Sequence, residues 1–156
     1  TDLFGLKTVI FRYFNVFGER APRKGQYAPV IGIFLRQLAS GEKLTIVGDG
    51  EQRRDFICVE DTIKVKRWFQ KHKNISGIYN VGTGVSRTFN DIANCVLAYF
   101  GKGKITYIDF PDNLINQYQA FTEADMTYLK SKGFDEKFTT LEKGVKDYLD
   151  WLSKNT

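Results

Sequence analysis

Hydrophobic residues along the chain follow two spacings, which predicts a mixture of strands and helices. Residues 7–14 are rich in β-branched and aromatic side chains and almost continuously apolar, a pattern typical of a strand buried on both faces of a parallel sheet. Apolar runs that end at turn residues predict further strands at 44–47, 54–59, 77–82 and 105–110. Only the first strand has the pattern of a large parallel sheet, so we expect the other elements to form a smaller lobe.

Apolar residues at helical spacing predict five helices. The first begins after Pro29 and ends before Gly41, and the second covers 60–72. Three threonines are expected to cap the later helices, because a threonine hydroxyl can accept a hydrogen bond from a free N–H of the first turn. They are Thr88, Thr122 and Thr140, for helices that end near residues 100, 133 and 152. The order of the elements indicates the α/β class.

Composition narrows the class of protein. The chain has 156 residues, 42% of them hydrophobic, which suits one folded domain and excludes a disordered chain. No stretch approaches 18 consecutive apolar residues and no leader-like segment opens the sequence, so we expect a cytoplasmic protein that does not enter the membrane. Cys58 and Cys95 lie in different predicted elements, which favours reduced core thiols over zinc or disulfides. The start at Thr1 suggests a piece of a longer chain.

Charge is unevenly distributed along the sequence. Residues 1–75 contain 14 Lys and Arg against 8 Asp and Glu, whereas residues 76–156 are nearly balanced. We therefore expect an anionic ligand to meet the first half. The polar loop predicted at 15–26 contributes three cations, namely Arg20, Arg23 and Lys24. Direct nucleic-acid binding is not expected, because no basic run exceeds three residues and the nearby aromatic residues follow core-like patterns.

Common nucleotide-binding and catalytic motifs are missing from the sequence. Gly-x-Gly occurs at 48–50, 82–84 and 101–103, but none continues into a dinucleotide fingerprint, and there is no Walker A loop. We interpret all three as turns. The Tyr-x-x-x-Lys at 128–132 would bring a phenol near an ammonium, but its place at a helix end favours chance spacing. His72 is the single histidine, which argues against a Ser-His-Asp system.

Two places are candidates for binding a phosphate or a sugar. Asn15 follows the first strand, where ligands of open α/β sheets collect, and its amide can donate and accept hydrogen bonds; the alternative is a residue that only shapes the turn. Arg53 and Arg54 follow a glycine turn, and a guanidinium suits bidentate binding of phosphate. Adjacent strand residues face opposite ways, so only one of the two points into a given cleft. The alternative is a surface ion pair with Asp55 or Glu51.

Four motifs, in this order along the chain, resemble a known family. They are RYFNVFG at 12–18, LTIVGDG at 44–50, RDFICVED at 54–61 and YNVGTG at 79–84. The set is similar to the C-terminal half of extended short-chain dehydrogenase/reductases that act on nucleotide sugars, the NAD-dependent epimerase/dehydratase family. The segment that starts YQAFTEAD at 118–125 is most similar to the ADP-heptose 6-epimerase branch of that family, whereas 25–30 is closer to the family in general.

The resemblance implies a fold and a reaction. Residues 1–18 would supply the last strand of a Rossmann-type parallel sheet with its exit loop, and 19–156 the small mixed α/β lobe that binds the nucleotide sugar. Enzymes of this family transfer a hydride transiently to NAD or NADP, with a Tyr-x-x-x-Lys pair in the Rossmann half. That half is absent here, so the chain alone is expected to be inactive.

Three alternatives remain open. The chain could come from a UDP-hexose 4-epimerase or from a sugar-nucleotide dehydratase. It could also be a non-catalytic module that binds a nucleotide sugar or assembles with a partner chain. Self-association through an exposed strand or lobe surface is expected in any of these cases.

The resemblance also implies roles for individual residues. Asn15 would contact the substrate, and Val16 would touch the nicotinamide cofactor through its backbone. Arg54 would hold the diphosphate and Tyr118 would reach the nucleotide sugar. The segment lining the nucleotide would consist of Ile46, Val47, Gly48 and Asp49.

The loop of the first half carries the remaining implied site. Lys24 falls on the lysine that acts as a second acid/base in the heptose epimerases, and Gln26 would lie beside it against the sugar. Gln26 stands where those enzymes have a small hydroxyl residue, and Ile33 stands where they have a substrate histidine. These two departures weaken the catalytic role of Lys24 and leave the identity of the sugar open.

Overall fold

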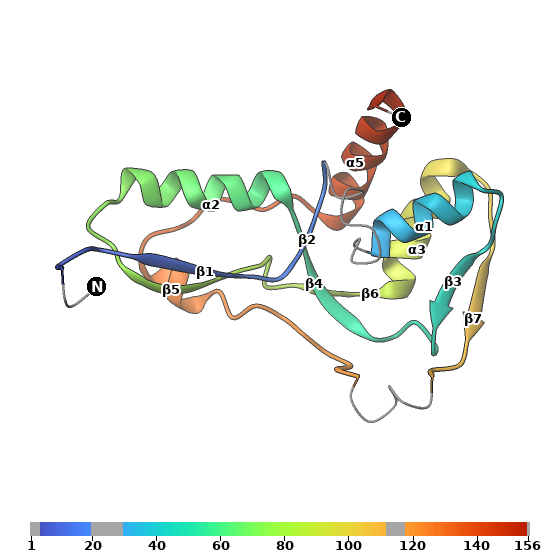
Figure 1. Cartoon of the computed structure of the whole chain (residues 1–156), viewed down its shortest axis with the longest axis horizontal. Helices are drawn as coiled ribbons and strands as arrows, with labels where there is room; N and C mark the ends of the chain where they lie inside the picture. The colour runs from blue at the N-terminus through green and yellow to red at the C-terminus, as the bar shows by residue number, and fades with distance from the viewer. Residues whose placement is uncertain (1–3, 20–29, 112–117, 156) are drawn as a thin grey trace.

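The computed structural model describes residues 4–19, 30–111 and 118–155. Strands and helices are mixed along the chain, as the α/β prediction requires (Figure 1). In order they are β1 (Val9–Tyr13), β2 (Asn15–Phe17), α1 (Val30–Ala39), β3 (Leu44–Val47), β4 (Arg53–Cys58), α2 (Val59–Lys71), β5 (Gly77–Val81), β6 (Ser86–Thr88), α3 (Phe89–Phe100), β7 (Ile105–Ile108), α4 (Thr127–Ser131) and α5 (Leu141–Asn155).

The strands form three small sheets, and most of their pairings are parallel. β1 pairs with β5, β2 with β4, and β3 with β7, all in parallel; β6 runs antiparallel to β4. The sequence pattern singles out only the first strand as a member of a parallel sheet, and the structure adds the parallel pairs β2–β4 and β3–β7. Strands β5 and β7 alternate in polarity or are short, so their sequences do not carry the continuous apolar pattern by which a buried parallel strand is recognised.

Three local predictions are corrected by the structure. Asn15–Phe17 is a strand and not the start of a loop, because its backbone pairs with Phe56–Cys58. Ser86–Thr88 forms a strand that the sequence analysis did not expect. Thr122 does not cap a helix: its N–H donates to the Arg53 carbonyl at 3.1 Å, which holds it in an extended segment beside β4. The helix that follows is only five residues long.

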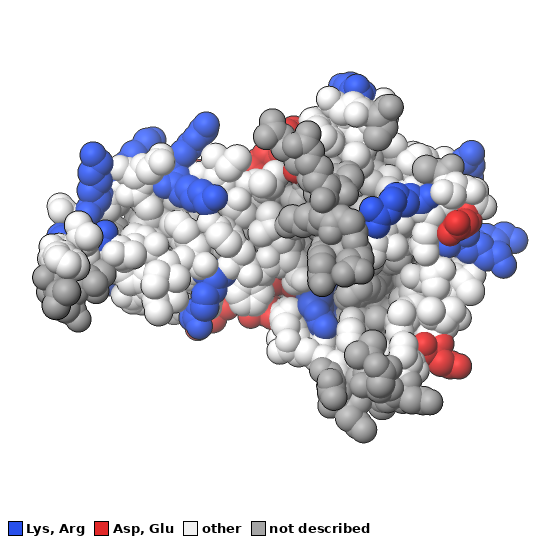
Figure 2. All heavy atoms as spheres, in the orientation of Figure 1, with Lys and Arg blue, Asp and Glu red and all other residues white. Residues whose placement is uncertain are grey.

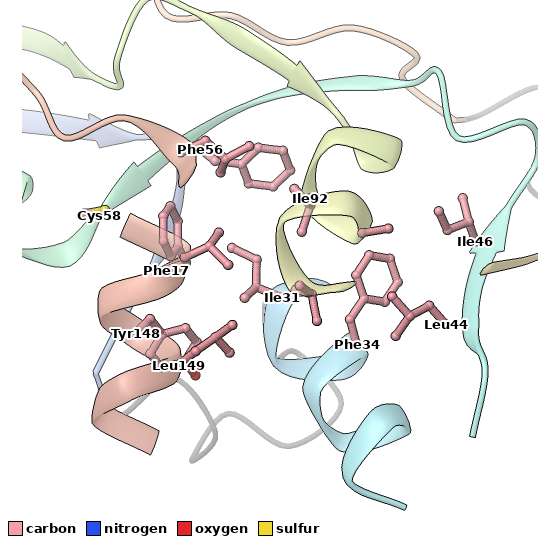
Figure 3. Close-up of a cluster of buried hydrophobic side chains, with 14 residues drawn as sticks. Phe17, Ile31, Phe34, Leu44, Ile46, Phe56, Cys58, Ile92, Tyr148 and Leu149 are labelled. Atoms are coloured by element: carbon pink, nitrogen blue, oxygen red, sulfur yellow. The ribbon is translucent and has the colours of Figure 1, made fainter. Parts of the chain in front are cut away.

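Strand β4 supplies side chains to two separate hydrophobic cores. Phe56 and Cys58 point into the first, which lies among α1, α3 and α5 (Figure 3). Ile57, between them, points into the second, which lies under α2. The alternation follows from the two-residue period of a strand. Each of the three side chains is at most 6% exposed, so both faces of β4 are covered.

Helix α2 packs along one face of the β1–β5 pair (Figure 1). The Phe69 ring of the helix lies 5.2 Å from the Phe11 ring and 4.7 Å from the Tyr79 ring. On the other face Ile10 and Ile78 are direct cross-strand partners, and each is 52% exposed. Parallel strands normally bury both faces, so this face has the composition of an interface.

The predicted caps at Thr88 and Thr140 are confirmed. The Thr88 hydroxyl accepts from the N–H of Asp91 at 2.9 Å, and the Asp91 carboxylate accepts from the N–H of Thr88 at 3.0 Å, which completes a capping box at the start of α3. The Thr140 hydroxyl accepts from the N–H of Lys143 at 3.3 Å in the first turn of α5.

Arg87 joins these two helix starts. Its guanidinium lies 2.9 Å from the carboxylate of Asp91 on α3 and 2.7 Å from that of Glu142 on α5. The hydrogen bonds from Arg87 lower the pKa of both carboxyls below their ordinary values. The ion triad therefore stabilises the packing of α3 against α5 only while the carboxylates are charged.

The contribution of Arg87 to stability should depend on pH. We expect Arg87→Gln to lower the free energy of unfolding at pH 7 by about 0.5–1 kcal/mol, the range for partly exposed pairs. Because both carboxyl pKa values are lowered in the folded state, this stability is present above the ordinary values of 3.8 and 4.5 and is lost as the pH falls through the folded values. Urea unfolding at pH 7, 5 and 3 should show the difference shrinking. A difference that is constant with pH, or equal in the exposed Arg67→Gln control, would contradict the prediction.

Candidate functional site

A cavity of about 360 Å³ opens beside the carboxyl end of β3. Its lining comes from the turn after β3, the segment after β7 and a segment that runs beside β4. The lining residues are Asp49, Glu51, Gln52, Phe110, Tyr118 and Ala120. Ligands of α/β proteins bind beyond the carboxyl ends of parallel strands, and β3 is such a strand. The cavity therefore occupies a typical place for a ligand.

The turn at the cavity mouth is rigid. Gly48 and Gly50 have φ angles of +71° and +78°, a region that favours glycine. Between them, the Asp49 carboxylate accepts from the N–H of Glu51 at 2.9 Å. Asn90, from the start of α3, donates to the Asp49 carbonyl at 3.0 Å and to the Glu51 carboxylate at 2.6 Å. Helix α3 thus fixes the turn in place.

An arginine and two aromatic rings form a cluster on one side of the cavity. The Phe110 and Tyr118 ring centroids lie 4.8 Å apart, and the Arg54 guanidinium lies 5.1 Å from the Tyr118 centroid. Arg54 uses one N–H group to donate to the Arg53 carbonyl at 2.7 Å. Among the described residues it has no ion pair. A guanidinium has five N–H donors, so Arg54 retains charge and donors for an anion.

Arg53 and Arg54 face opposite sides of β4, as their adjacency predicts. The Arg53 guanidinium donates to the Ser86 carbonyl at 2.7 Å and to its hydroxyl at 3.2 Å, away from Tyr118. The alternative of an ion pair with Asp55 or Glu51 is not seen within the described ranges. Asp55 instead turns inward and accepts hydrogen bonds from Thr83, Gly84 and Ala124.

Gln52 anchors the cavity wall to β3. Its side chain is 8% exposed, and its Nε2 donates to the Val47 carbonyl at 2.7 Å. The Oε1 of the same amide is buried without a hydrogen-bond partner in the described part of the chain. An unpaired buried acceptor costs about 1–3 kcal/mol, so a hydrogen-bond donor that reached this atom would be held favourably.

The predicted nucleotide-lining segment is only partly at the cavity. Asp49 lines it, and Gly48 meets its wall through the Phe110 ring. Val47 contributes its carbonyl, which holds Gln52. The Ile46 side chain is 1% exposed and belongs to the first core, because alternate residues of a strand face opposite ways.

Two further predicted residues lie on β2, outside the cavity lining. The Asn15 amide donates to the Asp55 carbonyl at 3.1 Å, so one of its donors joins β2 to β4. Val16 is half-buried and packs against the second core. Lys24 and Gln26, with Arg20 and Arg23, lie outside the described residues.

Four contributors to the site were missed by sequence reasoning. Asp55 was considered only as a surface ion-pair partner, although it is fully buried. Phe110 was assigned to a strand, and Gln52 and Asn90 were not considered. Phe110 reaches the site because the parallel pairing of β3 with β7 brings the segment after β7 beside Gly48, and no sequence pattern shows which strands pair.

Other chemistry has little support in the described residues. They contain no group of three His, Cys, Asp or Glu that could hold a metal ion, and none of their helices is long and apolar enough to span a membrane. Burial, followed by the charges of Asp61 and Glu60, raises the pKa of the Cys58 thiol to about 12, and burial also raises that of Cys95. Such thiols are poor nucleophiles. Lys and Arg are scattered over the face shown in Figure 2.

Known proteins are similar to this chain in sequence and in fold. Residues 1–82 match the NAD dependent epimerase/dehydratase family. The ADP-L-glycero-D-manno-heptose-6-epimerase of Alkalilimnicola ehrlichii is 46% identical over 155 residues, which cover 96% of this chain and 48% of that enzyme. This chain belongs to the NAD-dependent epimerase/dehydratase family. It spans about half the length of the relatives that it matches.

Two solved structures extend the comparison for this family member. The UDP-N-acetylglucosamine 4-epimerase of Methanobrevibacter ruminantium, solved with UDP-N-acetylmuramic acid, superposes with a TM-score of 0.85 at 29% identity, over 99% of this chain and 49% of that chain. The ADP-L-glycero-D-manno-heptose-6-epimerase of Helicobacter pylori superposes with a TM-score of 0.80 at 32% identity, over 94% and 44%. The expected likeness to epimerases and dehydratases of this family is confirmed.

The matched region of the NAD-dependent epimerase/dehydratase family covers only part of the cavity. Gly48, Asp49 and Arg54 fall within residues 1–82, whereas Phe110 and Tyr118 fall beyond them. The aromatic rings beside Arg54 therefore come from residues beyond the matched range, whereas Asp49, Glu51 and Gln52 of the cavity lining lie within it.

Gly48 should tolerate a side chain less well than Gly41, a glycine in a similar backbone conformation. A Cβ at Gly48 would overlap the Phe110 ring, whereas one at Gly41, with φ +75°, meets nothing within 4 Å. Both Gly48→Ala and Gly41→Ala incur the backbone penalty of about 1–3 kcal/mol. We expect Gly48→Ala to lose about 1 kcal/mol more, from overpacking, by urea unfolding. Equal losses would show that Phe110 yields freely.

Proposed function

We propose that this chain is the nucleotide-sugar-binding part of an NAD-dependent epimerase, and that the cavity beside β3 holds the nucleoside diphosphate. The observation that carries the proposal is Arg54, placed 5.1 Å from the Tyr118 ring centroid beside the cavity, without an ion-pair partner among the described residues. A guanidinium with free donors binds a diphosphate through charge-assisted hydrogen bonds. The family and the relatives with nucleotide-sugar substrates in their names support the same ligand.

The proposed ligand extends from the cavity toward β2. Arg54 binds the diphosphate, Tyr118 and Asp49 lie beside the nucleoside, and Asn15 reaches the sugar with the part of its amide that Asp55 does not use. Lys24 and Gln26, which lie outside the described residues, would also contact the sugar, as the family resemblance implies. A sugar at this end of β2 would lie near the carboxyl end of β1, where ligands of parallel sheets bind.

The nucleotide sugar that we propose as the substrate is an ADP-heptose. The 46% identity to a heptose 6-epimerase over 96% of the chain supports it, and so does the 32% identity to a second enzyme of that name. A UDP-hexose 4-epimerase is the second candidate, because the Methanobrevibacter enzyme superposes more closely, with a TM-score of 0.85. The heptose reaction would place the protein in lipopolysaccharide core biosynthesis in the cytoplasm.

The described residues do not fit the dinucleotide as its main binding site. The glycine turns that would have to cradle a pyrophosphate are filled by side chains. Cβ positions at Gly50, Gly82 and Gly103 lie within 3 Å of Asn90, of Ala124 and Asp55, and of Leu97 and Leu38. We propose that NAD, or NADP, binds mainly to a region that corresponds to the half of the relatives that this chain does not span. Val16 would lie at the edge of that cofactor site. The acid/base tyrosine belongs to the same part.

Replacing Arg54 tests the proposed function. We expect Arg54→Ala to weaken binding of ADP-glucose or UDP-glucose by about 1.5–3 kcal/mol, the range for a hydrogen bond to a charged group, as measured by isothermal titration calorimetry. Arg53→Ala is the matched control, since that arginine faces Ser86 on the other side of β4. An affinity that is unchanged by Arg54→Ala would sink the proposal.

The open face of the β1–β5 pair should mediate contacts between molecules. Ile10 and Ile78 form an exposed apolar pair there, and an uncovered strand pair can associate with another chain. We expect the isolated chain to form oligomers in light scattering, and Ile10→Lys with Ile78→Lys to shift it toward the monomer. Ile63→Lys, at a position of α2 that is 40% exposed, is the control. A wild-type chain that is monomeric at all concentrations would contradict this prediction.

A further inference from the structure

One buried carboxylate links β4, which carries Arg54, to the turn after β5 and to the segment that follows Tyr118. Asp55 is 0% exposed. Its Oδ1 accepts from the Thr83 N–H at 2.8 Å and the Thr83 hydroxyl at 2.6 Å; its Oδ2 accepts from the N–H groups of Gly84 at 2.9 Å and Ala124 at 3.1 Å. Among the described residues it has no cation partner, so these four donors compensate the carboxylate.

Neighbouring atoms pack closely around the Asp55 carboxylate. A Cβ at Gly82 would lie 2.6 Å from Asp55 Oδ2 and 2.5 Å from the Cβ of Ala124, so the chain must have glycine at this point of closest approach. Charge-assisted hydrogen bonds of this kind are short and directional. Asp55 therefore holds the turn after β5 and the segment at Ala124 at fixed distances from β4.

The segment that Asp55 holds is the one that presents Tyr118. Four residues before Ala124, the Ala120 carbonyl accepts from the N–H of Arg53 at 2.8 Å. The Thr122 N–H in turn donates to the Arg53 carbonyl at 3.1 Å. Residues 120–124 thus run beside β4 with a backbone contact at Arg53 and a side-chain contact at Asp55. Tyr118 lies two residues before Ala120 in the sequence, next to the backbone contact at Arg53.

Arg54 is placed by the same residues from the other side. It lies between Arg53 and Asp55 in β4, and adjacent strand residues face opposite ways. With Asp55 on one side of β4, Arg54 lies on the other side, where it is half-buried. The Arg54 guanidinium then meets Tyr118 at 5.1 Å from the ring centroid.

We propose that Asp55 is a positioning residue for the nucleotide-sugar site: by joining β4 to residues 120–124, it sets the distance between Arg54 and Tyr118. The proposal rests on the proposed function as far as it concerns affinity. Its structural part concerns the Arg54–Tyr118 geometry in the free protein and can be measured without a ligand.

Asp55→Asn tests this role directly. The change keeps the shape of the side chain but replaces one acceptor oxygen by an N–H₂ group, which faces N–H donors. We expect the affinity for ADP-glucose or UDP-glucose, by calorimetry, to fall about tenfold, equivalent to about 1.4 kcal/mol. Asp61→Asn is the matched control, since Asp61 is also 0% exposed and accepts from Lys64 at 2.6 Å and the Thr139 N–H at 2.8 Å, away from the cavity.

A nuclear magnetic resonance measurement distinguishes positioning from a general loss of stability. Because the Arg54 guanidinium lies 5.1 Å from the Tyr118 ring centroid, we expect its side-chain Nε–Hε signal to carry a ring-current shift, and Tyr118→Leu defines the position of the signal without it. In ligand-free Asp55→Asn the signal should move toward the Tyr118→Leu position, while in Asp61→Asn it should stay at the wild-type position. Thr83→Val replaces the hydroxyl by a methyl group, which removes one donor to Asp55 and the hydroxyl's contacts with Val85 but keeps the backbone N–H donor. It should move the signal part of the way and serves if Asp55→Asn does not fold.

The outcomes separate the two proposals. If the Arg54 signal stays at the wild-type position in both Asp55→Asn and Thr83→Val, the positioning role is overturned, whatever happens to affinity. If the signal moves but Arg54→Ala leaves affinity unchanged, the positioning role stands and the proposed function fails. An equal loss of affinity in Asp61→Asn would reduce Asp55 to a structural residue.

Discussion

Strand β4 is the element on which the two cores and the cavity all depend. It pairs with β2 along one edge and with β6 along the other, and its side chains alternate between the core among α1, α3 and α5 and the core under α2. Because the period of a strand is two residues, Arg54, Phe56 and Cys58 face one side of β4. Asp55 and Ile57 face the other. A shift of one residue in this strand would place the Asp55 carboxylate in the other core and Arg54 in the interior. The register is therefore strongly specified.

Much of the fold follows from sequence patterns, but the strand pairings do not. The helices after Pro29, Glu60, Thr88 and Thr140 follow from apolar spacing and capping residues, which act within one turn. β2 and β6 were missed because each is three residues long and exists through pairing with β4, some forty or thirty residues away. The segment after Thr122 was misread for the same reason: a cap residue followed by apolar residues is compatible with a helix, but hydrogen bonds to Arg53 keep it extended.

The candidate site was predictable in its residues and not in its assembly. Gly48, Asp49, Arg54 and Tyr118 were singled out through motif resemblance. Asp49 and Tyr118 line the cavity beside β3, Gly48 adjoins the Phe110 ring of its wall, and Arg54 lies against Tyr118. The ring of Phe110 and the amide of Gln52 shape that cavity, yet neither residue belongs to a sequence motif that indicates a chemical role. Their roles come from parallel pairing of β3 with β7 and from the path of 118–124 along β4, which are properties of the tertiary structure.

Arg54 and Asp55 are neighbours of opposite charge that face opposite sides of β4. This arrangement explains how Arg54 can keep its positive charge available beside the cavity. Oppositely charged neighbours on a flexible segment would be expected to pair, and a paired arginine binds anions less strongly. Here the strand turns them to opposite sides, and the backbone N–H groups of Gly84 and Ala124 with Thr83 satisfy the buried carboxylate. Neutral donors thus stabilise the anion without using a cation. The charge of Arg54 stays available beside the cavity, where the aromatic face of Tyr118 orients it.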